Sequence, residues 1–92
     1  MITAIVFVQA DVARIPEVAE QIAALDGVSE VYSVTGQIDL IALVRVRDHD
    51  AVAAVVSDKL NKVPGVLDTE THIAFRTYSR HDLESAFSLG LD

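Results

Sequence analysis

Residues 34–43, VTGQIDLIAL, decide the fold because a turn leads directly into the longest apolar run of the chain. The triplet Thr35-Gly36-Gln37 predicts a tight turn. Residues 28–34 before it and residues 38–47 after it are rich in β-branched and apolar side chains, so they predict two antiparallel strands. Asp39 stands at the start of the second strand, either as a solvated strand-end residue or as a carboxylate facing a partner that requires negative charge.

The segments on either side of this strand pair complete a simple order of elements. Residues 2–9, ITAIVFVQ, are apolar on both faces of a strand, which is typical of a central strand in a sheet. Residues 12–25 and 49–63 repeat apolar side chains every three or four positions and predict amphipathic helices. Residues 66–77 predict the last strand. The order predicts an α+β, ferredoxin-like βαββαβ fold, an antiparallel four-stranded sheet with both helices on one face.

One face of this predicted sheet is left without a cover. The helices reach one face only, and the other carries the apolar residues Ile5, Phe7, Ile41 and Leu43. Hydrophobic residues make up 51% of the 92 residues, which is more than so short a chain readily buries alone. We therefore expect a homodimer that packs through this face, with Asp39 near the subunit boundary.

Composition excludes several classes of function. The chain has 14 acidic against 7 basic residues and a net charge of −7, so direct binding of nucleic acid is not expected. It has no cysteine, hence no disulfide and no thiolate site. No apolar stretch approaches the ~18 residues of a membrane span, so we expect a cytoplasmic protein that does not insert into membranes.

The last predicted strand carries the polar residues most suited to chemistry. Asp68, Glu70 and His72 share one strand face and could bind a cation or perform acid–base work, or could form a solvated strand edge. Thr69 and Thr71 share the other face, where hydroxyls could bind a small polar ligand or simply favour a strand. No motif predicts a catalytic residue, a metal site or a cofactor.

Two stretches of the sequence carry a family resemblance. VSEVYSVTGQIDLIALVRV, residues 28–46, and LNKVPGVLDTETHIAF, residues 60–75, resemble the effector-binding domain of the Lrp/AsnC transcriptional regulators. In that family a Gly-x-x-Asp motif, here Gly36-Gln37-Ile38-Asp39, joins the second and third strands. A helix ending in Pro-Gly-Val, here Pro64-Gly65-Val66, leads to a threonine-rich last strand. The resemblance covers residues 1–78.

The resemblance implies a function in transcription regulation. It implies an amino-acid effector bound near the Gly-x-x-Asp turn, where the Asp39 carboxylate would pair with the ligand ammonium. It also implies dimers that assemble into larger oligomers, with possible co-assembly with full-length Lrp/AsnC regulators. The ligand-binding residues expected on this basis are Gly36, Gln37, Ile38, Asp39, Thr69 and Thr71.

The sequence departs from the family pattern in two places. Family regulators carry an N-terminal helix-turn-helix domain, whereas the first strand here begins at residue 2, so we expect a stand-alone effector domain. The tail, residues 79–92, has no counterpart in the resemblance and could form a short helix.

Two alternatives to an effector-binding module stay open at this point. Dimeric ferredoxin-like domains also include small monooxygenases and isomerases, whose pockets lie between sheet and helices. The helix-facing residues of the third strand are all apolar, which counts against such an enzyme, so no enzymatic activity is expected. The other alternative is a purely structural module that binds no ligand.

Overall fold

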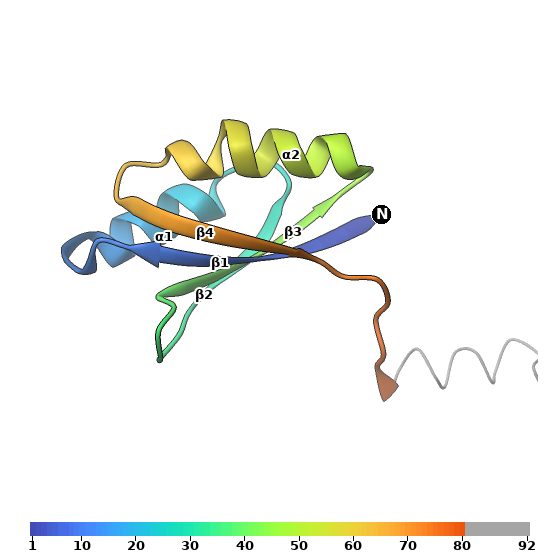
Figure 1. Cartoon of the computed structure of the whole chain (residues 1–92), viewed down its shortest axis with the longest axis horizontal. Coiled ribbons are helices and arrows are strands. Elements are labelled where there is room, and N and C mark those ends of the chain that lie inside the picture. The colour runs from blue at the N-terminus through green and yellow to red at the C-terminus, as the bar shows by residue number, and fades with distance from the viewer. Residues whose placement is uncertain (81–92) are drawn as a thin grey trace, which may run out of the picture.

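The computed structural model of the chain describes residues 1–80 and contains a four-stranded antiparallel sheet with two α-helices on one face (Figure 1). The strand order is β2-β3-β1-β4, so β1 and β3 are central. The elements are β1 (Ile2–Ala10), α1 (Ile15–Ala23), β2 (Val28–Ser33), β3 (Leu40–Val46), α2 (His49–Asp58) and β4 (Val66–Ile73), with 3-10 turns at Val12–Arg14 and Leu60–Lys62. The prediction of an α+β, ferredoxin-like fold is confirmed.

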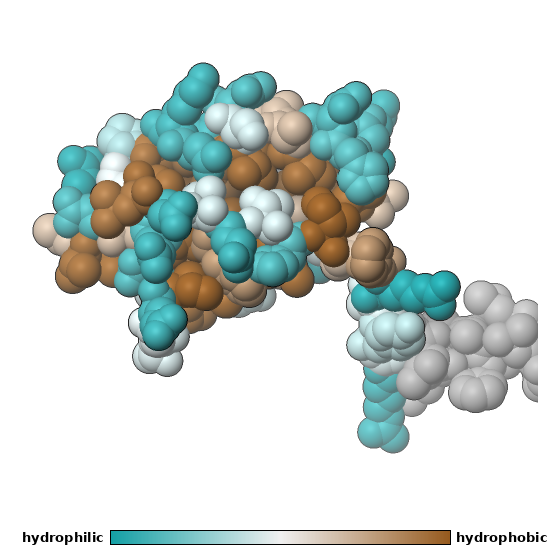
Figure 2. All heavy atoms as spheres, in the orientation of Figure 1, coloured by the Kyte–Doolittle hydropathy of each residue, from teal (hydrophilic) through white to brown (hydrophobic). Residues whose placement is uncertain are grey.

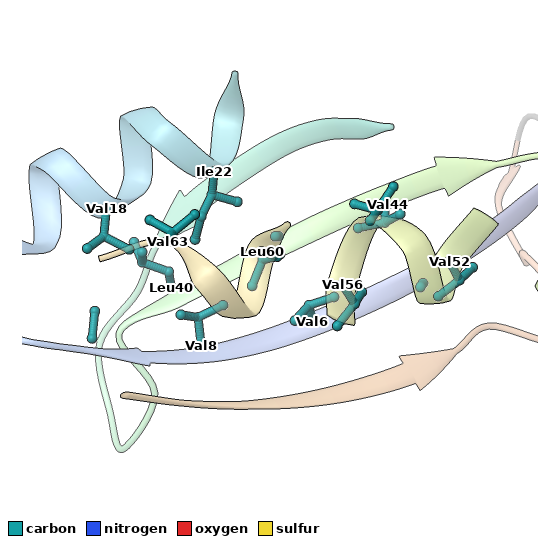
Figure 3. Close-up of a cluster of buried hydrophobic side chains, with 14 residues drawn as sticks. Val6, Val8, Val18, Ile22, Leu40, Val44, Val52, Val56, Leu60 and Val63 are labelled. Atoms are coloured by element: carbon teal, nitrogen blue, oxygen red, sulfur yellow. The ribbon is translucent and has the colours of Figure 1, made fainter. Parts of the chain in front are cut away.

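The sheet register places apolar side chains against the helices. Val6 of β1 lies opposite Ala42 of β3 and Thr71 of β4, and directly paired residues point to the same sheet face. The two helices bury this face in a continuous core (Figure 3). Its members are Ala4, Val6, Val8, Ala10, Val18, Ile22, Leu40, Ala42, Val44, Val52, Val55, Val56, Leu60 and Val63. The strand residues of this core come from alternate positions of β1 and β3, as a period of two requires.

The two halves of the chain turn from helix to strand in the same way. Gly27 and Gly65 both follow a helix and adopt φ values of +95° and +100°. A Cβ atom on Gly27 would lie 2.8 Å from Val55, and one on Gly65 would lie 2.7 Å from Val18. Each glycine therefore packs against the helix of the other half, and any side chain there would be strained and would collide.

The structure corrects several predicted element boundaries. The last strand ends at Ile73 rather than at residue 77, because Ala74 donates the final backbone hydrogen bond to Thr3 and β1 begins one residue before Thr3. The second helix ends at Asp58 and continues as a 3-10 turn rather than running to residue 63. The third strand begins at Leu40, two residues later than predicted. Most of the predicted tail helix lies outside the described residues.

Candidate functional site

The sheet face opposite the helices, called here the open face, carries a contiguous apolar strip on the two central strands. Phe7 pairs with Ile41 and Ile5 pairs with Leu43, and all four side chains are half-buried in the isolated subunit. These are the residues predicted to form the dimer interface, and they do lie together on one face. Hydrophobic side chains reach the surface of the body between hydrophilic ones (Figure 2).

Polar side chains of the β2 edge flank this strip on one side. Tyr32 lies opposite Ile41, and Glu30 lies opposite Leu43. The Tyr32 hydroxyl donates a hydrogen bond to Glu30, and this bond raises the pKa of Tyr32 above its ordinary value. The β2 edge of the open face thus combines an aromatic ring with a carboxylate.

The β4 edge flanks the strip on the other side. Glu70 lies opposite Phe7, and His72 lies opposite Ile5. The Nε2 atom of His72 lies 2.9 Å from a carboxylate oxygen of Glu70, and the His72 ring packs on Phe7 with ring centroids 5.1 Å apart. Both edges of the open face therefore present a carboxylate next to an apolar centre.

A hollow of about 260 Å³ lies where β1, the turn between β2 and β3, and β4 meet. Its lining combines carboxylates, carboxamides and apolar side chains, and it contains no basic residue. The lining residues are Phe7, Gln9, Gln37, Ile38, Asp68, Thr69 and Glu70. The two carboxylates of the lining, Asp68 and Glu70, favour a ligand group that donates hydrogen bonds, although Glu70 already contacts His72 Nε2 at 2.9 Å.

Asp39 has a structural role that neither sequence interpretation predicted. Its Oδ2 atom accepts a hydrogen bond from the Ala10 backbone N–H at 2.8 Å, beside the irregularity in the pairing of β1 with β4. The Asp39 backbone N–H donates to the Val8 carbonyl at 3.0 Å, and its own carbonyl accepts from Val34 at 3.1 Å. The carboxylate therefore satisfies a β1 donor near the point where the β1–β3 ladder ends.

The predicted ligand-binding residues separate into two groups in the structure. Gln37, Ile38 and Thr69 line the hollow, whereas Gly36, at the exposed turn with a φ of +108°, and Asp39 are not in its lining. Thr71 lies outside it as well.

The threonine hydroxyls of β4 are directed away from the open face. Thr71 pairs with Val6, whose side chain lies in the helix-covered core. The Thr69 hydroxyl donates to Asn61 Oδ1 at 2.7 Å, on the helix side of the sheet. Thr69 therefore contributes to the hollow while its hydroxyl is already bonded within the subunit.

Sequence reasoning named Asp68 and Glu70 only as a possible cation-binding or acid–base group, and it assigned neither them nor Gln9 and Phe7 to the ligand-binding site. The available signal was the alternation in β1, which places Phe7 and Gln9 on the same face, and the alternation in β4, which places Asp68 and Glu70 there. Their meeting depends on the β1–β4 register, in which Phe7 pairs with Glu70 and Gln9 with Asp68.

Residues 1–80 contain neither a candidate metal site nor a candidate membrane-spanning helix. No group of three or more histidine, cysteine, aspartate or glutamate side chains there is placed to hold a metal ion. In the same part of the chain, no helix has the length and apolar character needed to cross a membrane.

Comparisons with known proteins agree with this architecture. The family model of the Lrp/AsnC ligand-binding domain matches residues 3–83. An uncharacterized HTH-type transcriptional regulator of Pyrococcus horikoshii is 44% identical over 61 residues, which are 66% of this chain and 41% of the relative. The chain thus spans less than half of that relative's length.

Solved structures extend the comparison. The protein TTHA0845 from Thermus thermophilus superposes with a TM-score of 0.82 at 46% identity, covering 87% of this chain and all of the other. A transcriptional regulator of Neisseria meningitidis, solved in complex with L-Met, shares the fold with a TM-score of 0.76 at 21% identity, covering 86% of this chain and 53% of the other. The family match over most of the chain, together with these likenesses, shows that the chain belongs to the Lrp/AsnC ligand-binding domain family.

Proposed function

We propose that this domain binds an amino-acid effector in the hollow beside the β2–β3 turn and assembles through its open face as a module of transcription regulation. The observation that carries the proposal is the hollow itself. It places carboxylates, carboxamides and apolar side chains at one site. An amino acid presents the complementary set: an ammonium group, a carboxylate and a side chain.

Each group of the ligand has a counterpart in the hollow. The ammonium group would bind Asp68 and Glu70, because charge-assisted hydrogen bonds are the strong ones. The ligand carboxylate would accept hydrogen bonds from the Gln9 and Gln37 amides, and an apolar ligand side chain would pack on Phe7. The L-Met bound to the Neisseria regulator supports the amino-acid class of ligand.

Gly36 and Asp39 enter this proposal as parts of the turn. Asp39 ties the start of β3 to the end of β1 through Ala10, which positions Gln37 and Ile38 at the rim of the hollow. Because Asp39 does not line the hollow, its part in this proposal is to hold the turn and not to bind the ligand ammonium. Gly36 leaves the turn backbone open, since a Cβ atom there would meet nothing within 4 Å.

The open face supports the proposed assembly. The apolar strip of Ile5, Phe7, Ile41 and Leu43 would be buried between two copies of the chain, and further copies could join as dimers of dimers. Longer Lrp/AsnC regulators would offer a comparable face, so co-assembly with them follows from the same surface. The net charge of −7 supports a module that does not bind DNA directly.

An enzymatic role has no comparable support. A ferredoxin-like enzyme with a pocket between sheet and helices would place polar groups there. Within residues 1–80, every buried side chain is apolar. The regulatory role is therefore the one that the geometry supports best.

The test is a thermal-shift screen of the purified chain against the twenty amino acids, followed by calorimetry on those that stabilise it. The variant Glu70→Gln should weaken binding by about ten- to a hundredfold, the equivalent of about 1.5–3 kcal/mol for a hydrogen bond to a charged group. Thr71→Val, on the other sheet face, is the matched control and should leave affinity unchanged. If no amino acid stabilises the chain at millimolar concentration, the proposed ligand class is wrong.

A further inference from the structure

Residues 74–80, called here the arm, leave the sheet as an extended segment after β4. Ala74 makes the last backbone hydrogen bond to β1, through the Thr3 carbonyl at 2.9 Å. Because β1 begins at Ile2, no strand within residues 1–80 remains for the residues after Ala74 to pair with. Figure 1 shows the arm turning to the side of the sheet opposite the helices, which is the side of the open face.

The arm carries aromatic side chains that the rest of residues 1–80 leaves exposed. Phe75 is 98% exposed and Tyr78 is 79% exposed. In the space-filling view the arm extends from the edge of the body that residues 1–73 form (Figure 2). Large aromatic side chains contribute much of the energy of interfaces, and exposed ones on an extended segment indicate contact with another molecule.

The charge of the arm is opposite to that of the rest of the chain. The arm contains Arg76 and Arg80 and no acidic residue, although the whole chain has 14 acidic against 7 basic residues. Arg76 makes no salt bridge within residues 1–80. The open face, by contrast, has carboxylates at both edges, Glu30 on β2 and Glu70 on β4. A second copy of the chain therefore offers the arm both apolar area and complementary charge.

We propose that the arm of one subunit packs on the rim of the open face of a second copy. Phe75 and Tyr78 extend the apolar contact of the strip, and Arg76 meets a carboxylate at the partner's sheet edge. The exchange is reciprocal in a two-fold dimer, so each subunit gives and receives one arm. This inference rests on the proposed assembly through the open face and adds a second, separable contact to it.

The first test measures the strength of association by sedimentation equilibrium. The double variant Phe75→Ala/Tyr78→Ala should weaken association by roughly tenfold or more, as expected for interface aromatic residues. Val12→Ala is the matched control, because Val12 is 79% exposed but lies before α1, away from the arm. Circular dichroism should show that all variants keep the fold, since none of these side chains is in the core.

The second test uses the absence of cysteine in the chain. A Phe75→Cys variant is mixed with either Glu30→Cys or Glu70→Cys, and the disulfide-linked heterodimer is detected by mass. We expect cross-linking to at least one of these edge positions. Ala53→Cys, exposed on α2, is the control position and should not cross-link to Phe75→Cys.

The outcomes separate the arm from the proposed assembly. If the wild-type chain associates but the double variant associates equally well, the arm inference is wrong and the open-face assembly stands. Cross-linking that is absent at both edges, or equal at Ala53, overturns the arm contact in the same way. A wild-type chain that stays monomeric overturns both. Binding of the wild-type chain, but not the double variant, to anionic vesicles without self-association would assign the arm to a membrane and also overturn the inference.

Discussion

The two faces of the sheet use the same strands and reach opposite results. In β1, Val6 is fully buried beneath the helices, whereas its neighbour Phe7 on the open face is only half-buried. In β3 the same contrast holds between Ala42 and Leu43. One face is covered by the helices of the subunit itself, and the other also carries apolar side chains but has no helix over it within residues 1–80. The comparison teaches that apolar residues on both faces of a central strand report on assembly as well as on fold.

The two faces also differ in the kind of apolar residue that they use. The helix-covered face of the central strands is built largely from alanine and valine, such as Ala4, Val6 and Val44, which let helices approach closely. The strip on the open face uses phenylalanine, isoleucine and leucine. Larger side chains offer more apolar area to a partner, since the stabilisation scales with the area removed from water.

The largest effect on stability is expected from a substitution in the helix-covered face. Leu40 of β3 is fully buried against the helices, so Leu40→Ala should lower the free energy of unfolding by about 2–5 kcal/mol through lost burial and the resulting cavity. Urea denaturation at one fixed protein concentration measures it, because association also contributes to apparent stability. A loss below about 1 kcal/mol would mean that this face is not the core of the subunit.

The second effect, on self-association, is expected from a substitution on the open face of the same strand. Leu43→Glu should leave the circular dichroism spectrum of the subunit intact, because Leu43 is not covered by the helices. It should weaken self-association by roughly a hundredfold or more, since an unpaired charge would be buried in the interface. Sedimentation equilibrium provides the measurement. A variant that unfolds, or one that associates as tightly as the wild type, would contradict the distinction between the faces.

A smaller effect is expected at Asp39, whose carboxylate acts within its own subunit although it lies at the margin of the open face. Asp39→Ala leaves the Ala10 N–H without its acceptor and should cost about 1–3 kcal/mol in unfolding free energy. Asp39→Asn keeps a carbonyl oxygen in nearly the same place and should cost less. Equal stability of the wild type and both variants would show that the hydrogen bond from Ala10 to Asp39 does not stabilise the subunit.

The smallest effect compares neighbours in β4 that point to opposite faces. Thr69→Val removes the hydroxyl that donates to Asn61, so thermal or urea unfolding should show a loss of about 0.5–1.5 kcal/mol. Amino-acid affinity should fall less than in Glu70→Gln, because the Thr69 hydroxyl lies on the helix side of the sheet although the residue lines the hollow. Affinity that falls in Thr69→Val but not in Glu70→Gln would place the ligand on the wrong face for the proposed site.

The fold was predictable because its signals are local. Periods of two and of three to four residues identify the strands and helices, and the turn at Gly36 pairs β2 with β3. The end of β4 was not predictable from the residues of β4 alone. It depends on β1, whose Thr3 carbonyl accepts the last hydrogen bond from this segment. Strand propensity continues past Ile73 in the sequence, whereas the sheet does not.

The candidate site was predictable only in part for a similar reason. Gln37 and Ile38 follow from the turn motif, but Gln9 and Glu70 reach the hollow through the pairing of β1 with β4, which are distant in sequence. The hydrogen bond from Ala10 to Asp39 likewise joins residues 29 positions apart. Alternation along a strand shows to which face of the sheet each side chain points. Only the pairing register shows which side chains of different strands become neighbours.

The most direct test of the open face as a subunit interface is oxidative footprinting of the unmodified chain across a dilution series. Sedimentation velocity at each concentration gives the mass. We predict a mass of at least twice the 9.9 kDa of the chain at micromolar concentration. Phe7 and Leu43 should be protected there and become more reactive as the assembly dissociates, while Leu67, which is 71% exposed, should react equally throughout. A chain that stays at 9.9 kDa, or an assembly in which Phe7 and Leu43 react as they do in the monomer, would contradict the account.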